Sequence, residues 1–367
     1  MEKIIGKYTS AVIYSKTAED YAKAQIKQIC DNEACSQSII RVMPDVHPGQ
    51  VGPIGLTMTI GDKILPNLIG VDIGCGISYM KIKKCCIEYQ KLDKVIRENI
   101  PVGGKVRAKP LPASDTFDFT ELRCYKHIDE NKACLSLGTL GGGNHFIELD
   151  KDTNQDIYVF VHSGSRPLGK EVTEHYLKKG YEDLKHKGMK TPYELTYLEG
   201  AIMDDYLHDL LVVQEFASLN RKLILKELEK NMKWKSLEFG ECIHNYVDKN
   251  NILRKGASSA YIDETVIIPI NMRDGVILAK GKGNKDWNCS APHGAGRILS
   301  RSEVKNHHTV SDFKKSMKGI YSSTIGAGTL DEAPFAYRDI DEITEAIKDT
   351  VEIKSILKPI YNYKANN

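Results

Sequence analysis

The chain has 367 residues, of which 41% are hydrophobic and 27% charged, and this composition excludes a disordered protein and allows a substantial core. The 51 basic and 49 acidic residues leave a formal charge of only +2, so bulk charge neither implies nor excludes a nucleic-acid partner. Nine irregularly spaced cysteines do not resemble a disulfide framework, and residues 1–17 lack the apolar core of a signal peptide, so we expect a cytoplasmic protein. The apolar runs are too short to cross a bilayer, so we expect no membrane role.

Spacing and capping signals predict one helix near the N-terminus and further helices in the middle of the chain. A helix is expected to begin near Thr17, which has Asp20 three residues later as a capping partner, and to continue at helical spacing to Ile29. A break is expected at Gly188 and Pro192, because neither residue favours a helix interior. The further predicted helices span residues 90–99, 171–187 and 194–232.

Strands are predicted where short apolar runs end in turn residues. Residues 38–80 contain such runs broken by glycine and proline, which indicates strands and tight loops. Buried strands are also expected at 157–161, 266–270 and 276–279. The motif residues described below are scattered from Asp45 to Arg301 and must converge in space, so we expect one composite domain over residues 1–367.

A carboxylate and a thiol lie three residues apart in residues 71–76, where glycines allow Asp72 and Cys75 to reach one centre. Alone, this segment fits a buried cysteine beside a turn-capping aspartate equally well. Candidate imidazole ligands follow at His145, His162 and His244, two of them in glycine-rich turns. One Asp, one Cys and three His exceed the four ligands of a closed structural zinc site, whereas an open or two-metal catalytic site can use them all. Ligand softness alone favours zinc over manganese.

A second cluster lies at residues 291–297, where His293 precedes a turn of small residues. Such a turn allows a phosphate to approach main-chain N–H groups, and Arg297 and Arg301 are suited to hold its oxygens. A helix start with two solvated arginines explains the same string equally well. From the residues alone, His293 is a candidate nucleophile, acid or metal ligand.

Taken together, these motifs resemble the RtcB family of RNA ligases, in the same order from about Met43 to Arg301. Chance does not plausibly order so many strings. The resemblance implies an α+β fold of the family's own kind, with strands and glycine-rich loops around a deep two-metal cleft and helices outside. The matching strings are residues 43–47, 72–76, 141–146, 162–166, 244–245, 254–257 and 293–297.

The resemblance also implies a reaction. RNA ending in a 2′,3′-cyclic phosphate or 3′-phosphate would be joined to a 5′-hydroxyl end, in RNA repair or tRNA splicing. GTP is the implied co-substrate, and two manganese ions are the implied cofactors. His293 matches the residue that takes GMP from GTP as a phosphoramidate, before GMP passes to the RNA end and is displaced by the 5′-hydroxyl.

The family's functional residues are carried over by position. One manganese would be held by Asp72, Cys75 and His145, and the other by Cys75, His162 and His244. The expected nucleotide contacts are Asn144, Phe146, Glu148, Asn271, Gly294, Ala295, Gly296 and Lys364. The expected contacts to RNA or its phosphates are Asp45, Arg166, Arg297 and Arg301. The chain departs from the family at residues 269–272, where many members have Pro-Gly-Ser-Met, and the string around Lys364 is a weak match.

Two other functions stay open. In a metal-dependent phosphoesterase the same ligands would activate water and His293 would donate a proton. The other alternative is an RNA-binding module with a structural metal. The basic string at 254–256 favours such a module, whereas the surplus of candidate metal ligands argues against it. A labelled adduct with GTP distinguishes the ligase from both. The sequence identifies no activating protein partner.

Overall fold

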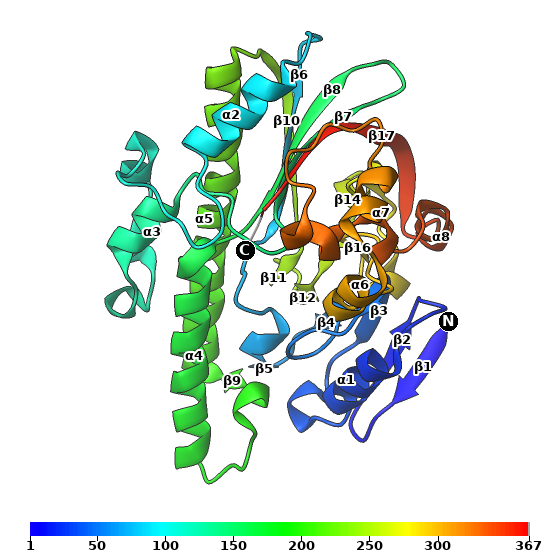
Figure 1. Cartoon of the computed structure of the whole chain (residues 1–367). Helices are drawn as coiled ribbons and strands as arrows, with labels where there is room; N and C mark the ends of the chain where they lie inside the picture. The colour runs from blue at the N-terminus through cyan, green and yellow to red at the C-terminus, as the bar shows by residue number, and fades with distance from the viewer. Residues whose placement is uncertain (366–367) are drawn as a thin grey trace.

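The computed structural model describes residues 1–365, and helices and strands alternate along it in a mixed arrangement (Figure 1). Two sheets contain most of the strands, and long helices lie outside them. This architecture confirms the expected α+β class. Among the described residues, no helix combines the length and the apolar character that a membrane span requires.

The larger sheet has seven antiparallel strands in the order β10-β6-β8-β7-β17-β15-β14. Every one of them contributes to a single apolar cluster, so the sheet curls around that cluster like half a barrel. On the opposite face, α2 (Tyr89–Asn99) and the second half of α5 (Gly200–Met232) cover β6, β7, β8 and β17, whereas α8 (Ile340–Ala346) packs against β14 and β15. In sheet order the strands are β10 (Ser236–Ile243), β6 (Gly76–Ile82), β8 (Ile157–Ser163), β7 (Phe146–Lys151), β17 (Val351–Lys364), β15 (Gly275–Gly281) and β14 (Thr265–Asn271).

The smaller sheet has six strands. His244 lies between β10, the edge strand of the larger sheet, and β11, the edge strand of the smaller one. Its strands β2 and β3 are parallel and are connected through α1 (Asp20–Cys30). In sheet order the strands are β1 (Glu2–Ile5), β2 (Ser10–Ile13), β3 (Ile40–His47), β4 (Ile54–Thr59), β12 (Ile252–Lys255) and β11 (Asn245–Val247). Two further strand pairs are β13 (Ala257–Ser259) with β16 (Ser290–Pro292), and β5 (Lys63–Ile64) with β9 (Leu198–Glu199).

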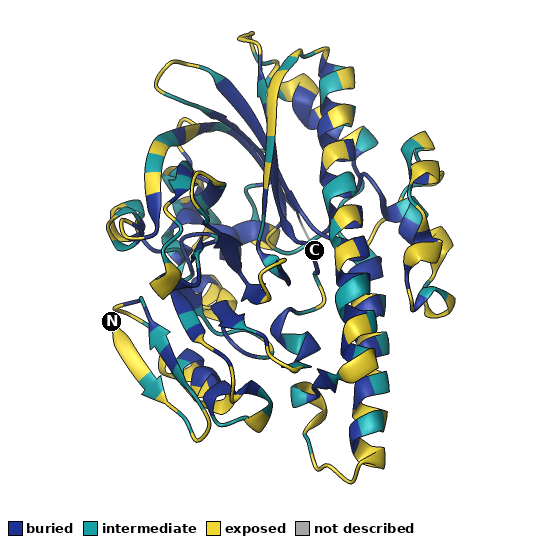
Figure 2. Cartoon of the chain, turned by 180° about the vertical axis from the view of Figure 1, so that it is seen from behind, coloured by how far each residue is buried: buried dark blue, intermediate teal, exposed yellow. Residues whose placement is uncertain are grey.

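Helix α5 runs the length of one side of the molecule and packs against α4 (Arg166–His186) and α2 (Figure 1). Its buried residues Tyr206, Leu210, Val213 and Ala217 recur three or four positions apart. Figure 2 shows the resulting alternation of buried and exposed surface along this helix. The remaining helices are short: α3 (Glu130–Ser136), α6 (Arg301–His307), α7 (Val310–Ser316) and α8 (Ile340–Ala346).

The predicted strands and the helix at 90–99 are confirmed, but three helix starts were wrong. The first helix begins at Asp20 with Glu19 at its N-cap position, so Thr17 lies outside the helix, and its hydroxyl is 3.5 Å from a carboxylate oxygen of Glu342. The helix expected from residue 171 begins at Arg166, since Pro167 is tolerated in a first turn. The helix expected from residue 194 begins only at Gly200, after the short strand β9. The predicted interruption between the two long helices is found after α4, at Gly188, whose φ is +74°.

Candidate active site

The five candidate metal ligands gather at one end of four neighbouring strands of the larger sheet. His162 lies near the end of β8, which pairs with both β6 and β7. Cys75 immediately precedes β6 and His145 immediately precedes β7, so the sheet register brings both beside His162. His244 follows β10, and its backbone N–H donates to the carbonyl of Cys75 at 2.9 Å. Asp72 lies in the turn that leads to Cys75.

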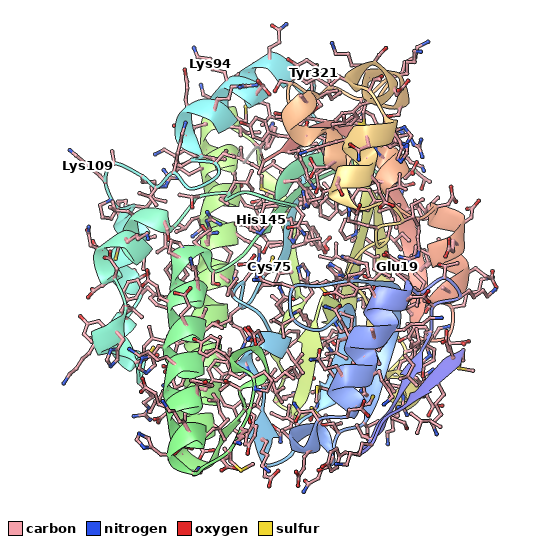
Figure 3. All side chains as sticks on the ribbon, turned by 60° about the horizontal axis from the view of Figure 1, so that its bottom comes forward. Glu19, Cys75, Lys94, Lys109, His145 and Tyr321 are labelled. Carbon is pink, nitrogen blue, oxygen red and sulfur yellow. The ribbon has the colours of Figure 1, made fainter. Side chains whose placement is uncertain are left out.

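The ligand atoms form two groups that share Cys75. The Cys75 Sγ atom lies 3.3 Å from Nε2 of His162 and 3.5 Å from Nε2 of His145. The Nε2 atoms of His162 and His244 are 3.3 Å apart, and Asp72 Oδ2 lies 3.1 Å from His145 Nε2. Within each group the ligand atoms lie within 4.8 Å of one another. The groups have the same membership as the two ligand sets implied by the resemblance, and Figure 3 shows Cys75 and His145 together inside the molecule.

The electrostatics of the cluster suit a divalent cation. Burial, followed by the charge of neighbouring histidines, lowers the pKa of His162 and of His244 well below the usual value, so both imidazoles are neutral and offer lone pairs. Burial opposes ionisation of Asp72, but the hydrogen bond and charge of His145 outweigh it and lower the pKa of Asp72 to about 2. Burial and the Asp72 charge raise the pKa of Cys75 well above its usual value, so a thiolate there requires a cation beside it.

Backbone carbonyls orient two of the ligand rings. Nδ1 of His145 lies 2.8 Å from the carbonyl of Leu140, and Nδ1 of His162 lies 3.2 Å from the carbonyl of Asn144. An Nδ1–H that donates to a carbonyl leaves the lone pair on Nε2, which in both rings is the atom that faces Cys75.

His293 lies beside the ligand groups without belonging to them. Its ring centroid is 4.8 Å from that of His244. Asp45 of β3 accepts hydrogen bonds from the backbone N–H of His293 at 3.2 Å and from Nδ1 at 2.7 Å. With Nδ1 protonated toward Asp45, Nε2 keeps its lone pair. The following turn requires glycine at Gly296, because its φ is +73° and a Cβ would clash with the backbone of Asp45.

Asp45 was expected among the RNA contacts, but its side chain is completely buried. Its Oδ2 atom is occupied by His293. This position favours an orienting role over a direct contact with RNA.

A cavity extends from His293 to the C-terminal strand β17. His162 lines it as well, so the cavity reaches the candidate metal ligands. Arg297 and Arg301 also lie in its wall. All eight residues expected to contact the nucleotide line it: Asn144, Phe146, Glu148, Asn271, Gly294, Ala295, Gly296 and Lys364.

One buried carboxylate, Glu332, contacts Lys364, Arg301 and Arg297 of this cavity. It accepts hydrogen bonds from Lys364 Nζ at 2.9 Å and from the hydroxyl of Tyr337 at 2.6 Å, and Arg301 Nη2 lies 3.0 Å from it. Burial opposes its ionisation, but Lys364 and Arg301 outweigh this effect and lower the pKa of Glu332 to about 2. Arg297 also lies 3.4 Å from Glu332, so these two arginines are not simply solvated.

Arg166 lies outside this cavity, in a separate depression that it shares with Asp72, His145, Lys132 and Lys170. Its Nη2 atom donates to the carbonyl of Gly103 at 2.9 Å, which anchors the side chain beside the candidate metal ligands. The expected phosphate-binding arginines therefore belong to two different openings near the same cluster.

Three cavity residues were not singled out from the sequence: Glu332, Tyr337 and Asn362. Strand alternation offers a signal for Asn362, since it lies two residues before Lys364 on the same face of β17. The basic string at 254–256 has a different role from the RNA contact considered for it. Arg254 is fully buried and pairs with Asp248 at 2.7 Å, and buried Lys255 donates to two backbone carbonyls.

Comparison with known proteins identifies the family. The model of the family described as tRNA-splicing ligase RtcB matches residues 25–120 and 111–365. The chain belongs to the RtcB family. It is 31% identical over 371 residues to the RNA-splicing ligase RtcB of Escherichia coli K12, with 88% of each chain covered. It is 26% identical over 429 residues to the tRNA-splicing ligase RtcB of Nanoarchaeum equitans, with 92% of this chain and 89% of the relative covered.

A third relative, the RNA-splicing ligase RtcB1 of another Escherichia coli strain, is also 31% identical over 371 residues, with 88% of each chain covered. These matches confirm the RtcB resemblance inferred from the motifs. They extend it beyond the motifs, because the family model continues through the C-terminal strand that carries Lys364.

Proposed function

We propose that this RtcB-family RNA ligase uses GTP and two Mn²⁺ ions to join an RNA 3′-phosphate or 2′,3′-cyclic phosphate end to a 5′-hydroxyl end, in RNA repair or tRNA splicing. The observation that carries the proposal is the placement of His293. Its ring lies in the wall of a cavity, next to His244 of one metal-capable group, and its Nδ1 atom is held by Asp45. A positioned histidine nucleophile beside divalent ions suits nucleotidyl transfer.

The two ligand groups around Cys75 would each hold one ion, with the thiolate shared. The neutral imidazoles of His162 and His244 and an ionised Asp72 fit a divalent cation. So does the Cys75 thiol, which lies 3.3 Å from Nε2 of His162 and 3.5 Å from Nε2 of His145. Ligand type does not select manganese over zinc, so the choice of manganese rests on the family resemblance. When bound, the ions would polarise phosphate oxygens and offset the negative charge that develops during the displacement.

The chain's own groups account for the covalent step. Nε2 of His293 attacks the α-phosphorus of GTP, the new N–P bond forms as the bond to pyrophosphate breaks, and the Asp45 carboxylate stabilises the positive charge on the ring. The turn at 294–296 admits the phosphate to main-chain N–H groups, with Arg297 nearby. A 2′,3′-cyclic phosphate end is first hydrolysed by water to a 3′-phosphate and a free 2′-hydroxyl. GMP then moves from His293 to the RNA 3′-phosphate, and the 5′-hydroxyl displaces it to form the new phosphodiester.

The far end of the cavity has groups that complement a guanine base. Glu148 offers carboxylate oxygens, and Lys364 offers N–H donors, which match the N–H groups and the carbonyl oxygen of guanine. Lys364 is held in place by the carbonyl of Asn144 at 2.9 Å and by Glu332. At residues 269–272, where the sequence departs from the family, the contact with the nucleotide differs as well. The side-chain amide of Asn271 donates to Asp274 at 2.8 Å within its own turn.

We also propose that residues 1–367 act as one catalytic domain in the reducing cytoplasm. The candidate site combines side chains from Asp45 to Lys364, which supports a single unit. All nine cysteines are free, and the proposed chemistry needs the thiolate of Cys75.

The test is incubation of the purified protein with Mn²⁺ and GTP labelled in its α-phosphate. The protein is expected to become covalently labelled through an acid-labile, alkali-stable bond. Addition of RNA with a 3′-phosphate and a 5′-hydroxyl should then release the label as GMP and yield joined RNA. Removal of the RNA phosphate by a protein that never becomes labelled would contradict the ligase and support the phosphoesterase.

Asp45→Asn is expected to slow formation of the labelled adduct by about 10²–10⁴-fold, because a neutral amide neither fixes the Nδ1–H tautomer nor stabilises the charged ring. Single-turnover labelling with GTP measures the rate. Manganese content and melting temperature serve as controls for the intact site and fold. A rate within twofold of the wild-type protein would show that Asp45 does not orient the nucleophile.

A further inference from the structure

Asp150 is a buried carboxyl group that the reaction described above does not use. It lies on β7 with no solvent exposure, and within residues 1–365 no N–H or hydroxyl group donates a hydrogen bond to either carboxylate oxygen. The residue opposite it on β17 is Pro359, which has no N–H to offer. Burial of an ionised carboxylate without donors is costly, so this environment favours the protonated acid.

Glu148 lies two residues earlier on the same face of β7, and it lines the nucleotide cavity. It is only 2% exposed. The side-chain amide of Asn362 donates to its Oε2 atom, and its carboxylate also interacts directly with the carboxyl group of Asp150. Two buried carboxyl groups in contact cannot both be ionised at neutral pH, so the pair shares one proton.

The surroundings decide which partner keeps that proton. Asn362 and Lys364 of β17 favour ionisation of Glu148, whereas the charge that favours ionisation of Asp150 is the more distant one of Lys358. Tyr158, opposite Asp150 on β8, is directed to Lys81. Burial and the charge of Glu148 raise the pKa of Asp150 well above its usual range, while burial raises the pKa of Glu148 only to about 7.

We propose that Asp150 is a positioning residue that stays protonated and donates its O–H to Glu148, so that the Glu148 carboxylate is held ionised and oriented toward the base of a guanine nucleotide. The proposal rests on the proposed nucleotide site. With Asn362 and Asp150 as donors on the protein side, the remaining lone pairs of Glu148 are available to N–H groups in the cavity. Without Asp150, Glu148 would lose a donor in apolar surroundings and would itself take up a proton.

The matched variants are Asp150→Asn and Asp150→Leu. The asparagine amide still donates to Glu148, whereas leucine has a similar size and no donor. Binding of GMP to the manganese-loaded protein, measured by calorimetry between pH 6 and pH 9, should change by less than about twofold in Asp150→Asn. In Asp150→Leu it should weaken about tenfold at pH 7, equivalent to about 1.4 kcal/mol, and recover at pH 9 as Glu148 loses its proton. Asp156→Asn, a partly exposed carboxylate paired with Lys81, is the control and should leave binding unchanged.

Infrared spectroscopy of the nucleotide-free protein measures the proton independently. The wild-type protein at pH 9, where Glu148 has lost its proton, should show the carbonyl stretch of a buried carboxylic acid, and Asp150→Asn should lack it. Tighter GMP binding by Asp150→Asn would mean that Asp150 is ionised, and this would overturn the proposal. Equal binding by the leucine and asparagine variants would also overturn it. If the wild-type protein binds no GMP, the proposed function fails, while the infrared band still decides where the proton lies.

Discussion

His293→Ala is expected to abolish labelling of the protein by GTP, with a decrease of about 10⁴–10⁶-fold in adduct formation, while the manganese content stays unchanged. The substitution removes the only nucleophilic atom that the proposed mechanism uses. The two ligand groups stay complete, because His293 belongs to neither of them. Labelling with GTP followed by elemental analysis of the same sample measures both quantities.

The same variant separates the first chemical step from the last. RNA supplied with GMP already attached to its 3′-phosphate should still be joined by His293→Ala, because this step needs bound ions and positioning more than the nucleophile. His186→Ala, at the exposed end of α4, is a matched control that should label normally. Covalent guanylate on His293→Ala, or a label mapped to a lysine, would refute the proposed mechanism even if the protein joins RNA.

Cys75→Ser is expected to lose both manganese ions and ligation together. Its Sγ atom is the only one shared by the two ligand groups, and it lies 3.3 Å from His162 Nε2 and 3.5 Å from His145 Nε2. A hydroxyl is harder to ionise than a thiol and reaches less far, so it is a poor substitute for a shared thiolate. We expect joining to decrease by about 10³-fold or more, since the loss of both ions removes several kcal/mol of charge stabilisation.

Elemental analysis after dialysis measures the occupancy, and thermal unfolding with added Mn²⁺ gives a second readout. Manganese should raise the melting temperature of the wild-type protein but not that of Cys75→Ser, because a ligand stabilises only a fold that binds it. Cys30→Ser is the control and should keep its metal, because it removes a buried thiol of α1 that belongs to neither ligand group. Full occupancy in Cys75→Ser would exclude the shared thiolate.

The sequence by itself determined the family, the α+β class and the ligand types, because these depend on local strings and on side-chain periodicity. The apolar run at 157–161 is confirmed as β8, and the helix at 90–99 is confirmed as α2. Both signals survive folding because each is contained within one element. The glycine-rich turns before β7 and after β16 were recognisable for the same reason.

Tertiary structure decided every property that depends on distant partners. Thr17 lies outside the first helix, and its hydroxyl is 3.5 Å from Glu342, which is 325 residues away in the sequence. The same applies to Asp45, which is separated by 248 residues from the histidine that it holds. Hydrogen bonds and burial of this kind are set by sheet register and packing, which no local pattern encodes. Packing also buries Glu148 and Asp150, which share one face of β7, in the apolar interior of a curled sheet, where a carboxyl group without donors keeps its proton.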